Sequence, residues 1–125
     1  MPSIVKFESD GDVLTARVLE TRLMDDATIG RFHAEIIEGL GKKEDPNLLI
    51  DFSRVHFLSS SALGALLRVH KKCKEYKVAL KLCNITPDIH EVFKITNLVK
   101  IFDIHADEAD AHKAFKKKGG FFFRG

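Results

Sequence analysis

The chain lacks the sequence features that mark metal centres, redox sites and membrane spans. Its only two cysteines are Cys73 and Cys83, and their spacing gives neither a zinc-ribbon nor a redox C-x-x-C motif. No apolar run approaches the ~20 residues that cross a bilayer. The opening stretch, MPSIVKFESD, contains no apolar signal core. We therefore expect a cytoplasmic protein without a membrane span, with two reduced and buried thiols.

Charge of one sign is not in excess either. The 125 residues include 20 Lys and Arg against 18 Asp and Glu, so the net charge is only +2. A nucleic-acid-binding domain usually shows a strongly basic face. The one dense basic run, at 116–118, is explained by a solvated chain end. We therefore expect no nucleic-acid partner.

Motifs for cofactors and for nucleophilic catalysis are missing. The chain has no G-x-x-x-x-G-K-[ST] and no G-x-G-x-x-G sequence. The stretch SSSALG lacks the leading glycine of a G-x-S-x-G nucleophile elbow. The acids and histidines between 105 and 112 fit the acidic first turn of a helix and have no known metal-ligand spacing. We expect no cofactor, no metal and no enzymatic activity.

The hydrophobic pattern predicts strands that alternate with helices. Period-two or continuous apolar runs predict strands over 3–9, 13–20, 48–52, 77–84 and 98–104, and helical spacing predicts helices over 29–40, 62–73, 86–97 and 107–118. This order implies right-handed crossovers. The fold class is therefore α/β, with a mixed, mostly parallel sheet of about five strands flanked by about four helices. We expect one domain over 1–118 and a tail over 119–125 that belongs to no element.

Two helix ends carry residue signals. Thr86 followed by Pro87 predicts an N-cap and the first helical residue. Gly41, directly after Leu40, predicts a left-handed residue that ends its helix.

Three consecutive serines, Ser59 to Ser61, stand between an apolar strand and a helix. In open α/β sheets, sites form where a parallel strand ends and a helix begins. The free N–H groups of a helix start also favour an anion. From the residues alone three readings stay open: helix caps and turn-formers, a catalytic nucleophile, or a point of phosphate attachment.

The stretch LLIDFSRVHFLSSSALGALL resembles the signature of the STAS domain, the anti-sigma factor antagonist family. In that family an apolar strand ends in Asp-Leu-Ser-x-Val. A short apolar segment follows, then Asp-Ser-Ser or Asp-Ser-Thr, then a small residue, Leu and Gly or Ala at a helix start. The matching residues are Asp51, Ser53, Val55, Phe57, Leu58, Ser60, Ser61, Ala62, Leu63 and Gly64. The order of the elements is similar to the family up to residue 117.

The resemblance implies a regulatory binding protein. Ser61 matches the residue that a serine kinase phosphorylates, and Ser60 is the alternative. That kinase is typically the anti-sigma factor itself, with a histidine-kinase-like ATPase fold. The dephosphorylated protein binds it and frees the sigma factor, and a serine phosphatase resets the cycle. The expected partner-binding residues are Asp51, Ser53, Ser59, Ser60, Ala62, Leu63 and Gly64.

Within this set, Asp51 and Ser53 are expected to shape the loop before the serines. Ala62 and Gly64 are expected to let a partner approach the helix start. The sequence also leaves a homodimer open.

One position departs from the family pattern. Ser59 stands where the family usually has an acidic residue. This keeps open a different kinase, or a scaffold that is not phosphorylated, as in stressosomes or transport-accessory subunits. A separate alternative is a small enzyme that uses the serines. The run Phe121–Phe123 is expected to dock on the body of the domain, to dock on a partner, or to stay disordered.

Overall fold

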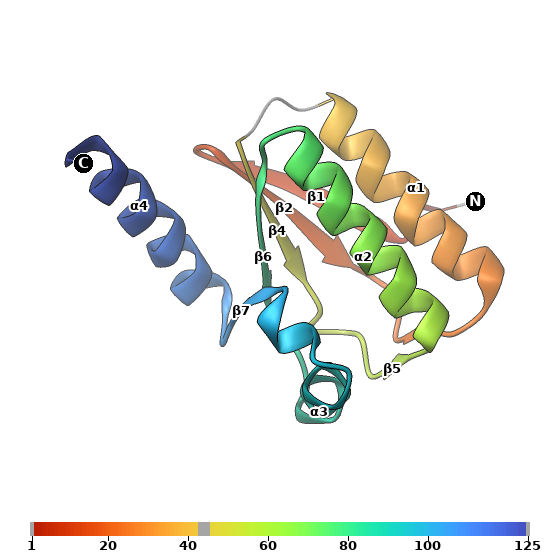
Figure 1. Cartoon of the computed structure of the whole chain (residues 1–125). Coiled ribbons are helices and arrows are strands. Elements are labelled where there is room, and N and C mark those ends of the chain that lie inside the picture. Colours follow the sequence, from red (N-terminus) through yellow and green to blue (C-terminus); the bar gives the residue numbers. More distant parts are fainter. Residues whose placement is uncertain (1, 43–45, 125) are drawn as a thin grey trace.

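A computed structural model of the chain describes residues 2–42 and 46–124. Strands and helices alternate along most of it (Figure 1). The elements are β1 (Val5–Asp10), β2 (Val13–Val18), β3 (Arg22–Leu23), α1 (Asp26–Lys42), β4 (Asn47–Asp51), β5 (Phe57–Leu58), α2 (Ser60–Glu75), β6 (Ala79–Cys83), α3 (Pro87–Ile95), the 3-10 turn η1 (Leu98–Lys100), β7 (Asp103–His105) and α4 (Glu108–Arg124).

The main sheet has five strands in the order β1-β2-β4-β6-β7. β1 is antiparallel to β2, and all the other neighbours are parallel. The predicted mixed, mostly parallel sheet with four flanking helices is confirmed. A second, two-stranded sheet joins β3 to β5.

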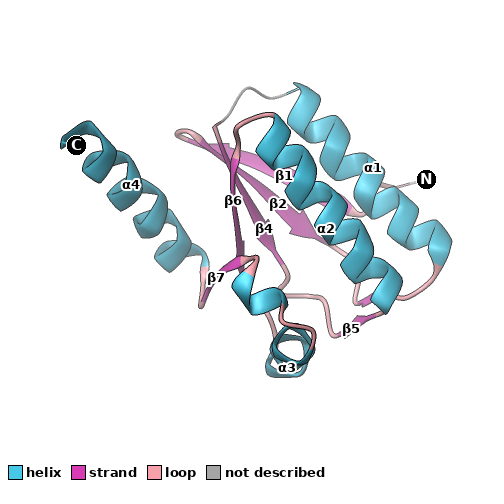
Figure 2. Cartoon of the chain, in the orientation of Figure 1, coloured by secondary structure: helices cyan, strands magenta, loops and turns pink. Residues whose placement is uncertain are grey.

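The helices lie on both faces of the main sheet (Figure 2). α1 and α2 cover one face, α4 lies on the other, and α3 lies at the end where β4 and β6 finish. Leu48 and Ile50 of β4 belong to the core cluster that includes residues of α1 and α2, whereas Leu49 packs with Phe115 of α4. A strand covered on both faces is nearly all apolar, which is why 48–52 shows no alternation.

Two predictions about helix ends have different outcomes. Pro87 begins α3 and Thr86 caps it, because the Ile89 N–H donates to Thr86 Oγ1 at 3.4 Å. The prediction for Gly41 is wrong, because α1 continues through it to Lys42. Gly11, in the β1–β2 turn, is the glycine with positive φ within the described ranges. A helical glycine costs only about 1 kcal/mol, so it need not end a helix.

The sequence prediction also missed several boundaries. The segment 98–104 is not one strand: Leu98 and Phe102 are both buried, four residues apart, which is helical spacing, and only Asp103–His105 pairs with β6. The helix predicted to end at 118 continues to Arg124, so 119–124 does belong to an element. The strands β3 and β5 were not predicted, because two residues carry no periodicity.

No helix of the described segments is long and apolar enough to cross a membrane. The side chains of the run Phe121–Phe123 lie outside the described residues.

Candidate functional site

One of the three serines has a structural role, and the other two are exposed to solvent. Ser59 is the N-cap of α2: its backbone is extended (φ −89°, ψ 167°), and the Ala62 N–H donates to its Oγ at 3.2 Å. The Ser59 N–H donates to the Leu23 carbonyl at 3.0 Å, which ties the cap to β3. Ser60 and Ser61 are the first two helical residues, and both are exposed. The capping interpretation therefore holds for Ser59 and leaves the other two hydroxyls open to solvent.

The start of α2 offers donors to an anion. Within the described segments, neither the hydroxyl nor the backbone N–H of Ser60 or Ser61 has a hydrogen-bond partner. The first N–H groups of a helix point along its axis with no intrahelical acceptor, and the helix dipole adds a positive field. A negative group on either hydroxyl would therefore be stabilised at this position.

The loop before the serines is anchored by Asp51, the last residue of β4. Its side chain is only 4% exposed, and its carboxylate accepts three hydrogen bonds. The donors are the Arg17 guanidinium at 2.6 Å, the Ser53 backbone N–H at 2.9 Å and the Asn84 amide at 3.1 Å. Asp51 thus fixes the turn that leaves β4.

Arg17 connects this anchor to α4. Its Nε donates to Glu8 at 2.6 Å, its Nη1 to Asp51, and its Nη2 to both carboxylate oxygens of Glu108 at 2.7 and 2.8 Å. Hydrogen bonds to Glu8 and then to Glu108 raise the pKa of the guanidinium, so its charge is fixed. One side chain of β2 therefore holds together the end of β4 and the first turn of α4. The sequence prediction missed Arg17, since its partners lie up to 91 positions away.

The other expected partner-binding residues point in different directions. Ala62 and Leu63 are 1% and 8% exposed and belong to the core cluster. Ser53 is exposed. Gly64 is half-buried with open space beside it, because a Cβ there would meet only the tip of the Arg68 side chain, at 3.8 Å. Close approach of a partner is therefore physically open at Ser60, Ser61 and Gly64.

An exposed apolar group beside the serines was also missed. Phe57 of β5 is 49% exposed, and the Arg22 guanidinium lies 4.7 Å from the centre of its ring. Met24, which follows β3, is 44% exposed. Phe57 also borders an open depression lined by Thr21, His56, Thr86, Pro87 and Asp88. The motif placed Phe57 in the sequence, but its exposure follows from the β3–β5 pairing, which the sequence does not reveal.

The remaining candidate chemistry is accounted for by local structure. No group of three metal-ligating side chains occurs among the described residues. The Asp110 N–H donates to Asp107 Oδ1 at 2.8 Å, so Asp107 closes the start of α4. Cys73 and Cys83 are buried and unpaired, and burial raises the pKa of their thiols to about 11 and about 12. Such thiols are protonated and unreactive at neutral pH.

Known proteins share this fold and resemble this sequence. An anti-sigma factor antagonist from Mycobacterium paratuberculosis superimposes with a TM-score of 0.77 at 24% identity, over 88% of this chain and 91% of that one. The Bacillus cell fate determinant SpoIIAA, in its phosphorylated form, gives a TM-score of 0.64 at 17% identity, over 88% and 98%. In sequence, a protein of Bordetella bronchiseptica named as an anti-sigma factor antagonist, BtrV, is 29% identical over 94 residues, which are 75% of this chain and 80% of that one. The family model for the STAS domain matches residues 7–111, and the chain therefore belongs to the STAS domain family.

Proposed function

We propose that this STAS protein acts as an anti-sigma factor antagonist whose binding is switched by phosphorylation of Ser61. The observation that carries the proposal is the position of Ser61. Its hydroxyl is exposed at the second residue of α2, beside free backbone N–H groups, in the register of the family motif. The relative BtrV, named as an anti-sigma factor antagonist, and the fold shared with phosphorylated SpoIIAA support it.

The physics of a phosphate at Ser61 favours a switch at an interface over a change of fold. Phosphorylation adds a charge of about −1.5 to −2. At a helix N-terminus this is favourable by about 0.3–1 kcal/mol. The Ser61 side chain makes no hydrogen bond in the described structure that the phosphate would break. The free protein should therefore keep its structure when phosphorylated.

A partner that binds at the N-terminus of α2 should lose much of its affinity when Ser61 is phosphorylated. Phe57, Met24 and Gly64 offer apolar or bare surface beside the exposed serine. A dianion pressed against such a contact loses water without gaining a matched partner. A hundredfold loss of affinity needs only about 2.7 kcal/mol.

The partner that fits this proposal is an anti-sigma factor that is also a serine kinase, with a histidine-kinase-like ATPase fold. A serine phosphatase would restore the binding form. The protein would then work in the cytoplasm as a binding partner and not as an enzyme. Asp51 and Ser53 would act by holding the loop, and Ser60, Ser61 and Gly64 by contact.

Ser59, which stands in place of the family's usual acid, still caps the N-terminus of α2. Aspartate and serine are both good N-caps, so Ser59→Asp should leave the stability unchanged. Ser59→Ala should lower the free energy of unfolding by about 1 kcal/mol. If Ser59→Asp also raises the rate of Ser61 phosphorylation, the missing acid serves the kinase and not the fold.

The proposal is tested first on protein purified from its own host. Intact mass and peptide mapping over 55–68 should show a fraction with one phosphate, on Ser61. Ser61→Asp should then weaken capture of the anti-sigma factor, whereas Ser61→Ala should retain it, as should Ser9→Asp, which makes the same charge change on the exposed edge strand β1. Unmodified serines under both growth and stress, with Ser61→Asp binding normally, would replace the switch with a constitutive scaffold.

A further inference from the structure

The outer side of β1 carries backbone groups that face away from the sheet. The Leu19 N–H donates to the Ile4 carbonyl at 2.7 Å, so Ile4 directs its carbonyl toward β2. Successive residues of a strand direct their backbone groups to opposite sides. Val5, Phe7 and Ser9 therefore direct their N–H and C=O groups away from β2, along the edge of the main sheet.

One of these groups is already satisfied. Glu35 of α1 accepts the Val5 N–H at 3.0 Å. Phe7 and Ser9 have no backbone partner within the described residues on this side. Natural proteins usually blunt such an edge, because it pairs readily with another strand. Six residues of β1 are long enough to do so.

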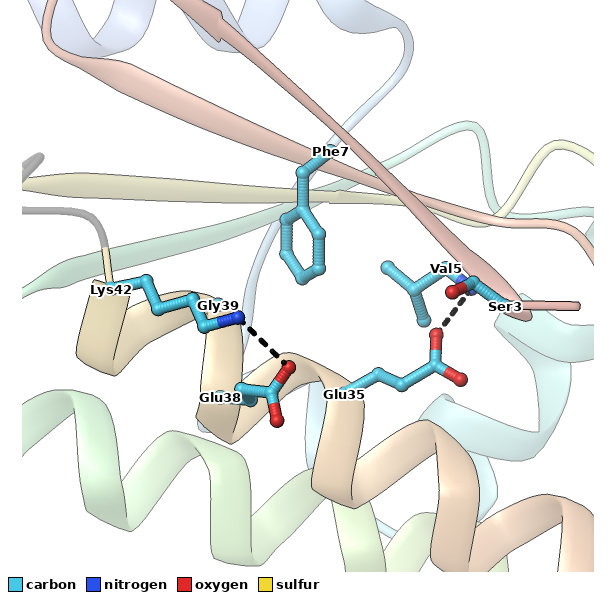
Figure 3. Close-up of a pocket in the computed structure, with 7 residues that line it drawn as sticks. All are labelled: Ser3, Val5, Phe7, Glu35, Glu38, Gly39 and Lys42. Atoms are coloured by element: carbon cyan, nitrogen blue, oxygen red, sulfur yellow. Dashed lines mark hydrogen bonds and ion pairs between the residues drawn. The ribbon is translucent and has the colours of Figure 1, made fainter.

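A groove runs between this edge and α1 (Figure 3). It is lined by Ser3, Val5, Phe7, Glu35, Glu38, Gly39 and Lys42, and it has a volume of about 180 Å³. The Phe7 ring points toward α1 at Gly39, where an added Cβ would lie 2.4 Å from the ring. Because position 39 has no side chain, half-buried Phe7 fits against the helix and leaves the groove open at its side.

The charged side chains of β1 indicate which strand can pair with this edge. Lys6 and Glu8 are exposed and lie on the same face of the strand, on either side of Phe7. We propose that β1 of a second copy of this chain pairs with this edge, antiparallel, about a two-fold axis at Phe7. Lys6 of each copy then lies opposite Glu8 of the other, and the two Phe7 rings lie side by side at the grooves.

The same charges exclude the other symmetric registers. An axis at Lys6 or at Glu8 places like charges directly opposite, and an axis at Ser9 places Glu8 across from Asp10. An axis at Val5 places Lys6 opposite Ile4 and Glu8 opposite Pro2, so it brings no opposite charges together. The register at Phe7 joins both Phe7 N–H groups to carbonyls and gives each Ser9 N–H the Val5 carbonyl of the other copy. The Val5 N–H groups remain bonded to Glu35 and add nothing to the pairing.

This dimer leaves the serine end free. β1 is antiparallel to β4, whose carboxyl end leads to the serines, and the two-fold axis reverses one copy relative to the other. The two Ser61 hydroxyls would therefore lie at opposite ends of one ten-strand sheet. Each copy would present its own partner-binding end, so the proposal does not depend on the proposed function.

The test is the mass of the full chain in solution, by sedimentation equilibrium from low to high micromolar concentration. The wild type should dimerise. Lys6→Glu places two acids opposite each other twice in the dimer and should weaken it at least about ten-fold. Lys100→Glu makes the same charge change on exposed η1 and should have no effect. Ser9→Pro removes an N–H that no group of the described residues accepts, so it should fold normally and stay monomeric.

Hydrogen exchange reports on the register directly. The amides of Phe7 and Ser9 should exchange quickly in dilute protein and slowly in concentrated protein, while the Lys6 amide, bonded to β2, stays protected at both. A wild type that is monomeric throughout, or a dimer that survives both Lys6→Glu and Ser9→Pro, would overturn the proposal.

Discussion

Replacing Arg17 by methionine should destabilise the protein through Asp51. Methionine keeps the apolar stem of the side chain but removes the guanidinium. Asp51, with its side chain only 4% exposed, would then have no cation beside it. Removing one member of a fully buried ion pair costs about 3–5 kcal/mol.

The loss of stability expected at Arg17 is smaller than for a fully buried ion pair. The Arg17 side chain is 34% exposed and Glu108 is 30% exposed, so water reaches part of the network. Asp51 also keeps the Ser53 N–H and the Asn84 amide as donors. We therefore expect Arg17→Met to lower the free energy of unfolding by about 2 kcal/mol.

The control is a second acid bound to the same arginine. Glu8, with a side chain 49% exposed, accepts a hydrogen bond from Arg17 at the surface and takes no part in the bonds to Asp51. Glu8→Gln should cost no more than about 0.5 kcal/mol. Asp51→Asn combined with Arg17→Met should cost at least about 1 kcal/mol less than the sum of the two single changes.

The measurement is urea unfolding followed by far-ultraviolet circular dichroism. The chain has no tryptophan and one tyrosine, so fluorescence offers little. If Arg17→Met unfolds within about 0.5 kcal/mol of the wild type, or if the double variant is additive, Asp51 does not depend on Arg17 and the anchoring argument fails.

Two further predictions concern α1 and α2. Gly39→Ala should destabilise the fold by about 1–3 kcal/mol because its methyl group meets the Phe7 ring. Gly30→Ala, in the same helix with no atom within 4 Å of the added Cβ, should stabilise the fold by about 0.5–1 kcal/mol. Urea unfolding midpoints measure both changes in stability. Equal effects of the two variants would contradict the packing argument. Burial, and then nearby cationic side chains of α2, lower the pKa of His33 and His70 below the usual 6.5. As the pH falls through 6.5, the unfolded chain takes up protons before the folded one, so stability should drop, by at most about 1.4 kcal/mol per pH unit for each histidine. Replacing both by glutamine should flatten that slope between pH 7.5 and 5.5, and an unchanged slope would assign it to other groups.

The elements that the sequence revealed are those with long periodic patterns. The buried strand 48–52 and the stripe that includes Ala62, Leu66 and Val69 on α2 are set by burial over many residues, so composition and spacing suffice. The strands β3 and β5 have two residues each, and they form only by pairing with each other. No local signal encodes such a pairing, and the exposure of Phe57 was hidden with it.

The same distinction applies to the site. A contiguous motif marked Asp51 and the serines, whereas Arg17, Asn84 and Glu108 come from three other parts of the chain. Each of these is an ordinary polar residue in its own segment. The parallel order β2-β4-β6, with α4 behind it, brings Arg17 and Asn84 to the Asp51 carboxylate and Glu108 to Arg17.

In the proposed switch, the two halves of the motif have different roles. The first half is held in place: Asp51 is buried, and its three bonds reach β2, the turn after β4 and the residue that follows β6, so the point where the chain leaves β4 is fixed. The second half is open: Ser59 closes the helix, and the next two hydroxyls make no bond in the described structure. A phosphate on Ser61 would then change charge and shape at a fixed point while disturbing no contact of the fold. Because the loop before Ser61 is fixed and the hydroxyl makes no bond, the added phosphate would change the affinity for a partner. In a mobile loop the chain would rearrange around the phosphate instead, and the effect on affinity would be smaller.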